Sequence, residues 1–117
     1  MSIVAVGNTT VLTPSAGNIA NVGNVSTRTT TFHVLNANAT VYAYVGIFSA
    51  YAQAIAMDHP TVGADATGIP LAPNESMTIT GNFGTSANIS TVYVSAITNT
   101  GTTSVFFTPV AAGSSAN

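Results

Sequence analysis

The C-terminal third of the chain reads Ser90-Thr-Val-Tyr-Val-Ser-Ala-Ile-Thr98, then Asn99-Thr-Gly101, then Thr102-Thr-Ser-Val-Phe-Phe-Thr-Pro-Val110. The two longer runs are rich in β-branched and aromatic residues, which are typical of strands. The segment between them contains Asn and Gly, which tolerate the positive φ of a short loop. These features predict a β-hairpin. Because an isolated hairpin is only marginally stable in water, the rest of the chain must supply further strands and a second apolar layer.

The composition is ordinary in apolar content and unusual in charge. The chain has 117 residues, which suits one domain with one core. Hydrophobic residues make up 46%, but only 3% are charged, against about 25% in typical soluble domains. A net charge of -2 is too small to attract nucleic acid or an anionic membrane surface. A surface without charges is poorly protected against self-association. We therefore expect assembly, with a neutral secreted β domain as the alternative.

The sequence also indicates in which cellular compartment the protein is made. It contains no cysteine, so stability is expected from packing or partners and not from disulfides. The N-terminal segment Met1-Ser-Ile-Val-Ala-Val-Gly7 lacks the basic start and long apolar run of a secretion signal. No run approaches the roughly 18 apolar residues of a membrane helix. These patterns favour a protein that is made in the cytoplasm, left unprocessed and not bound to a membrane.

The first half of the chain predicts short extended segments separated by turns. Residues 3–6 form an apolar strand candidate that could pair with residues 9–13. Residues 15–24 are rich in Gly, Asn and Ala and predict a loop. A strand is expected over residues 25–35, because consecutive threonines disfavour a helix. Another is expected over residues 40–48, where both faces are apolar, as in a central strand.

The second half begins with an ambiguous segment. Residues 50–57 alternate alanine with larger residues, and this period of two favours a strand over a helical turn or two. Residues 58–68 predict the longest loop. Residues 69–75 are extended but contain two prolines, which lack the donor of a full ladder member. Residues 76–80 alternate cleanly and predict a strand, and residues 81–89 predict another connection.

Together these segments predict an all-β protein, an antiparallel β-sandwich of Ig-like or jelly-roll-like type with about six to eight short strands. We expect a single domain over residues 1–117, with residues 1–24 as a candidate N-terminal arm and residues 111–117 as a flexible tail. Five side chains are expected in the core between the sheets: Phe32, Val45, Ile79, Val94 and Val105.

No catalytic, cofactor or metal site is expected from the sequence. The only acidic residues are Asp58, Asp65 and Glu75, and neither a nucleophile elbow nor a metal-binding spacing accompanies them. Asp58, His59 and Asp65 share one predicted loop, but without the pattern of a calcium loop. His33 falls in a predicted strand, where a hydrogen-bonded or surface histidine is the simplest interpretation. An enzyme is therefore the least favoured class.

Four tyrosines leave a second class of function open. Tyr42, Tyr44, Tyr51 and Tyr93 could together form a platform on which a sugar ring stacks. In alternating strands, however, tyrosines more often serve as core or interface residues whose hydroxyls reach the rim. The tyrosines are therefore compatible with a carbohydrate-binding module and with an interface between subunits.

Three segments carry a family resemblance. They are Gly68-Ile-Pro-Leu-Ala-Pro-Asn-Glu75, Thr91-Val-Tyr-Val-Ser-Ala-Ile97 and Gly101-Thr-Thr-Ser-Val-Phe-Phe-Thr-Pro109. Their order resembles small virion proteins of tailed bacteriophages, in particular the β-sandwich head-decoration or cement proteins. The resemblance covers about the C-terminal half and is a pattern of strands and turns with no catalytic motif. It implies a structural role on the outer surface of a capsid.

We therefore expect a capsid decoration protein that binds and stabilises a phage head. Its expected partners are the major capsid protein and copies of itself, for example in a trimer. A tail or fibre component and a carbohydrate-binding module remain the alternatives. An apolar strand near a chain end can add to a neighbour's sheet edge. The expected contact residues are Ile3, Val4, Val6, Tyr42 and Tyr44.

Overall fold

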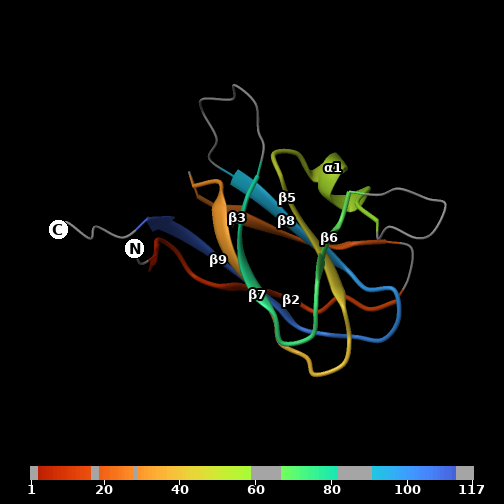
Figure 1. Cartoon of the computed structure of the whole chain (residues 1–117). Coiled ribbons are helices and arrows are strands. Elements are labelled where there is room, and N and C mark those ends of the chain that lie inside the picture. The colour runs from red at the N-terminus through yellow and green to blue at the C-terminus, as the bar shows by residue number, and fades with distance from the viewer. Residues whose placement is uncertain (1–2, 17–18, 28, 59–66, 82–90, 113–117) are drawn as a thin grey trace.

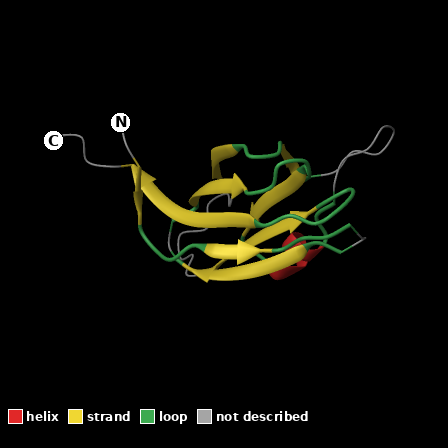
Figure 2. Cartoon of the chain, turned by 90° about the horizontal axis from the view of Figure 1, so that it is seen from below, coloured by secondary structure: helices red, strands yellow, loops and turns green. Residues whose placement is uncertain are grey.

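The computed structural model describes residues 3–16, 19–27, 29–58, 67–81 and 91–112. In these residues two antiparallel sheets lie face to face, and one short helix covers the outside of the second sheet (Figures 1 and 2). The elements are β1 (Ile3–Ala5), β2 (Thr10–Leu12), β3 (Asn21–Ser26), β4 (Thr31–Asn36), β5 (Ala43–Phe48), α1 (Tyr51–Ile55), β6 (Ile69–Leu71), β7 (Ser76–Thr80), β8 (Thr91–Ile97) and β9 (Val105–Ala112).

The strand order is that of a jelly roll. The first sheet runs β1-β9-β4-β7, with β2 also pairing with β9, and the second runs β3-β8-β5-β6. From β2 to β9, every connection except that from β5 to β6 passes from one sheet to the other. This crossing pattern distinguishes a jelly roll from an Ig-like sandwich, in which consecutive strands often share a sheet. The predicted all-β sandwich is confirmed, with nine strands in the described residues.

The predicted hairpin between the last two strands is wrong. Strand β8 pairs with β3 and β5, whereas β9 pairs with β4, β1 and β2 in the other sheet. The turn itself is where the sequence places it, since Gly101 has a φ of 80° and its carbonyl accepts a 2.7 Å hydrogen bond from the Thr98 hydroxyl. Strand composition and a glycine indicate that the chain reverses. They do not specify whether the second strand returns to the same sheet.

The core lies between the two sheets and follows the alternation in the sequence. Phe32, Val45, Ile79, Val94 and Val105 are all buried in one cluster, as predicted. Strand β5 is central, with neighbours on both sides. Its inward side chains belong to this cluster, while its outward side chains pack in a second cluster beneath α1. Both faces of β5 are therefore covered, as its apolar sequence predicts.

The N-terminal third differs from expectation in its pairing. Strands β1 and β2 each pair with β9 and not with one another. Residues 21–24, predicted as part of a loop, belong to β3 and pair with β8. The strand predicted over residues 25–35 is interrupted between β3 and β4.

Threonine side chains account for this interruption. The Thr29 backbone N–H donates to the Thr27 hydroxyl at 3.2 Å, and the Thr31 N–H donates to the Thr29 hydroxyl at 3.3 Å. The Thr29 hydroxyl in turn donates to the Val110 carbonyl at 3.0 Å. Short polar side chains compete in this way with the backbone partners of a sheet. A run of threonines thus favours a corner here as well as a strand.

The strand favoured for residues 50–57 is also wrong, because α1 spans Tyr51–Ile55. The helix lies on the outer face of the second sheet, where Ala54 and Met57 are fully buried. The Ala54 carbonyl accepts a 2.8 Å hydrogen bond from the buried Ser95 hydroxyl of β8. A Cβ at Gly46 would lie 2.8 Å from the Met57 sulfur, so glycine gives this segment room to approach the sheet. The alternating alanines therefore do not distinguish a strand with a small-residue face from a helix that packs closely on a sheet, and here they form a helix.

Candidate interaction surfaces

One edge of the first sheet is built from β1 and β2 in succession along β9. The Val6 N–H donates to the Pro109 carbonyl at 2.9 Å, and Thr10 stands opposite Phe107. The three residues 7–9 therefore stand opposite Thr108 alone, which is a bulge in the edge strand. The Thr9 and Thr108 hydroxyls are joined by a 2.7 Å hydrogen bond.

Pro109 explains why the edge strand breaks at this point. Its carbonyl bonds to Val6, but its nitrogen carries no hydrogen and returns no bond to the edge strand. A Cβ built at Gly7 would lie 2.8 Å from the Pro109 Cγ. Only a residue without a side chain can therefore pass the proline ring at this distance. The proline and the glycine together divide the edge into β1 and β2.

Strand β1 is apolar and exposed on both of its faces. The side chains of Ile3, Val4 and the following Val6 are 48%, 50% and 49% exposed to solvent, and Ala5 is exposed as well. Val11 of β2 has a similar exposure of 49%, but its neighbour Leu12 is in the core. Strand β2 therefore behaves as an ordinary edge strand with one buried face. Strand β1 extends past the sandwich with neither face covered.

The two tyrosines predicted as contact residues lie on the second sheet, apart from β1. Tyr42 precedes β5 and is 53% exposed. Tyr44 is half-buried and packs against the cluster of Ala20, Met57 and Ile97. The structure thus places Ile3 and Val4 on β1 and Val6 directly after it, but it does not bring Tyr42 and Tyr44 to them. Tyr44 serves the packing of the outer face.

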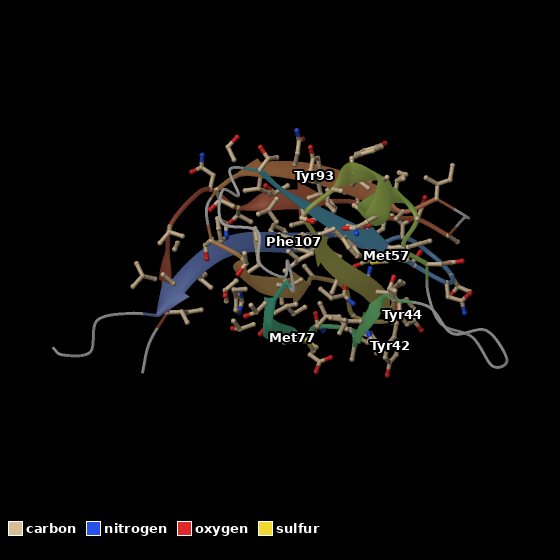
Figure 3. All side chains as sticks on the ribbon, turned by 90° about the horizontal axis from the view of Figure 1, so that it is seen from above. Tyr42, Tyr44, Met57, Met77, Tyr93 and Phe107 are labelled. Carbon is tan, nitrogen blue, oxygen red and sulfur yellow. The ribbon has the colours of Figure 1, made fainter. Side chains whose placement is uncertain are left out.

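The four tyrosines do not form one platform. Tyr51 of α1 and Tyr93 of β8 contact each other edge-to-face, with ring centroids 6.1 Å apart and planes at 77°. Figure 3 shows Tyr93 well separated from Tyr42 and Tyr44. Tyr51 remains 54% exposed. The candidate surface for a flat ligand is therefore limited to Tyr51 and Tyr93.

A pocket opens beside α1 on the outer face of the second sheet. It measures about 480 Å³ and is lined by Ile47, Phe48, Gln53, Ala56 and Thr67. The lining residues that the structure describes offer van der Waals contact, together with the Gln53 amide and the Thr67 hydroxyl for hydrogen bonding.

Two of the described ionisable residues, Glu75 and His33, lie apart from the pocket. The Glu75 carboxylate accepts a 2.7 Å hydrogen bond from the Ala72 N–H, within a turn in which Asn74 has a φ of 60°. His33 is half-buried on the outward face of β4. Within the described ranges no three His, Asp or Glu residues gather as metal ligands. His59 and Asp65 of the candidate loop lie outside the described residues, as do the predicted connection 82–89 and residues 113–117 of the tail.

A buried asparagine that the sequence analysis did not single out organises one end of the sandwich. Asn36 ends β4 and is fully buried. Its amide donates to the carbonyls of Val41, Leu71 and Ala72 at 2.8, 3.1 and 3.2 Å. Its side-chain oxygen accepts a 2.5 Å hydrogen bond from the Thr103 hydroxyl. Three loops that are distant in sequence therefore meet on one side chain. The only sequence signal is an asparagine at the expected end of a strand.

Comparisons with known proteins add no assignment. No family model matches the chain, and searches of curated proteins and of solved structures give no match. In the portion of the chain that is described, no helix has the length and apolar character to cross a membrane.

Proposed function

We propose that the protein is a structural virion subunit, a decoration protein that binds the outer surface of a phage capsid and stabilises the lattice of major capsid protein. The observation that carries this proposal is an almost uncharged surface with an uncovered apolar strand. The chain has one Lys or Arg and three acidic residues, while Ile3 and Val4 of β1 and the following Val6 are about half exposed.

The physical argument rests on the cost of burying such a surface. Thr, Asn and Ser side chains lose less conformational entropy on burial than Lys or Glu. They also leave no unpaired charge in an interface, which would be expensive to desolvate. Interface centres are depleted of charged residues for these reasons. A jelly roll with this surface suits a position between subunits of a shell.

The fold supports the proposal without deciding it. Jelly rolls occur in viral capsid proteins and also in lectins, and a shared fold does not imply a shared function. The resemblance of the C-terminal half to head-decoration proteins favours the first of these uses. A tail or fibre component would satisfy the same surface argument, and fractionation of virions into heads and tails separates the two.

The experiment is co-sedimentation with capsids of the virus that carries the gene. Purified protein is mixed with capsids that lack it, and the pellet is compared with a tube without capsids. We expect the protein in the pellet with the capsids, at a fixed ratio to the major capsid protein. Particles prepared from infected cells should contain it at the same ratio. The same sedimentation is repeated with isolated tails. Protein that stays in the supernatant in both experiments would refute the structural role.

A second candidate, a carbohydrate-binding module, is favoured by the contact between Tyr51 and Tyr93. Tyrosine rings beside polar side chains can stack on sugar rings, and Asn24 stands next to Tyr93 across the strand pair. Titration with soluble oligosaccharides would test this candidate. Saturable binding that is lost in Tyr51→Ala would favour it over the virion role, and absence of binding would eliminate it.

A further inference from the structure

The hydrogen-bond pattern of β1 fixes which backbone groups face outward. Val6 donates to Pro109, so the backbone groups of Val6, and of Val4 two residues earlier, face β9. In an antiparallel pair the intervening residues face the opposite side. The N–H and C=O groups of Ile3 and Ala5 therefore point away from β9. In the described residues, β1 pairs with β9 and no other strand.

The outward edge of β1 carries no charge, no proline and no polar face, and the bulge at residues 7–9 lies beyond it. Edge strands avoid association through charges, prolines, bulges or one polar face. Strand β6, an edge of the second sheet, carries Pro70, and β7 alternates serine and threonine with its inward residues. Strand β1 has the sequence Ile-Val-Ala, followed by Val6, and both of its faces are exposed. A strand with two apolar faces is normally buried on both sides.

We propose that β1 pairs antiparallel with β1 of a second copy of this chain, so that the first sheets of the two subunits join into one continuous sheet. The two-fold axis passes through Val4. Ile3 then stands opposite Ala5 of the second copy, and these two pairs exchange four backbone hydrogen bonds. Val4 faces Val4 of the second copy at a pair without hydrogen bonds, where the Cα atoms are about 4.5 Å apart.

Three properties of the strand favour a second copy over a different protein. The pairing is self-complementary, because a strand related by a two-fold axis perpendicular to the sheet presents the same apolar residues to itself. A net charge of -2 gives little repulsion between copies. The strand carries no charge with which to select a different partner. Such a contact closes at two subunits, so it builds a dimer and not the trimer considered from the sequence.

A single-cysteine variant tests the contact directly, because the chain contains no cysteine. The separation of about 4.5 Å at Val4 lies within the roughly 4.4–6.8 Å between Cα atoms that a disulfide spans. We expect Val4→Cys to form covalent dimers under mild oxidation. Val11→Cys is the matched control, since Val11 lies on the same edge with nearly the same exposure, 49% against 50%. We expect little cross-linking of the control.

A backbone variant provides the complementary test. Ala5→Pro removes an outward N–H but leaves the bonds from β1 to β9 intact, so it should convert the dimer to monomer in sedimentation velocity runs. Its circular dichroism spectrum should match that of the parent. The inference is overturned if the parent is monomeric at the highest attainable concentration, or if the two cysteine variants cross-link equally. These outcomes are independent of capsid binding, because no capsid is present in either experiment.

Discussion

The backbone of Gly7 lies directly against the ring of Pro109 on the neighbouring strand, so close that a Cβ on residue 7 would be 2.8 Å from the Pro109 Cγ. The pair creates the bulge that separates β1 from β2. It allows β2 to contribute Leu12 to the core while β1 continues past the sandwich. The uncovered strand is thus a consequence of two residues that are more than a hundred positions apart.

Replacing Gly7 with Ala should destabilise the protein by about 1 kcal/mol or more, because the added methyl group overpacks against the proline ring. Among the described glycines only Gly101 has a positive φ, so backbone strain at residue 7 does not contribute. Urea denaturation measures the change. In a Pro109→Ala background the penalty should shrink, as a double-mutant cycle would show. An equal loss of stability in both backgrounds would show that contact with the Pro109 ring is not the reason why residue 7 must be glycine.

Asn36→Leu should cost about 3 kcal/mol or more in the free energy of unfolding. The substitution removes two buried hydrogen bonds, to the Leu71 carbonyl and the Thr103 hydroxyl, and two part-buried ones, to the carbonyls of Val41 and Ala72. Each unsatisfied buried group costs about 1–3 kcal/mol. Asn38→Ala is the control, because the Asn38 side-chain oxygen accepts hydrogen bonds from two backbone N–H groups in this region but Asn38 is less buried. We expect it to cost about 1 kcal/mol. Similar costs for the two variants would contradict the central role of Asn36.

Val94→Asp should prevent soluble expression. Val94 is fully buried on β8, and a buried carboxylate without a partner costs about 3–5 kcal/mol or more, a large part of a typical stability of about 5–15 kcal/mol. Thr91→Asp, on the opposite face of the same strand, should express normally. A folded Val94→Asp protein would mean that the side chains of β8 face the other way.

The sequence predicts what depends on near neighbours. The alternation around Phe32, the central position of β5 and the turn at Gly101 could all be predicted, because burial and reversal follow from local pattern. The pairing of β8 and β9 could not, since an apolar face does not identify the strand that lies beside it. The bonds from Asn36 to Leu71 and Ala72 join residues far apart in sequence and leave no local trace.

The apolar surface of β1 could also be predicted only in part. The run Ile3–Val6 indicates an apolar strand, and the structure shows it exposed. The sequence does not indicate that β9 covers only one of its edges. Tyr44 has the same local pattern as an interface residue but lies in the cluster beneath α1. Alternation identifies the face of a strand and not whether a helix covers that face.

Binding to capsids should be nearly independent of salt. With so few charges, attraction between protein and capsid comes from apolar and neutral polar contacts. Raising the ionic strength from about 0.1 M to about 1 M shortens the Debye length from about 10 Å to about 3 Å and should change the bound fraction little. Release of the protein in this range would show that charges make the contact.

The most direct measurement is the fraction of protein that sediments with capsids, compared between the full chain and a variant without residues 1–6. This deletion removes β1 but keeps β2 and its core residue Leu12. The account predicts that the variant stays folded by circular dichroism and binds capsids about tenfold or more weakly, a difference of about 1.4 kcal/mol, because without the β1 contact it is a monomer that attaches to the lattice at one point where the dimer attaches at two. A full-length chain that does not sediment with capsids, or a folded variant that binds as well as the full chain, would contradict it.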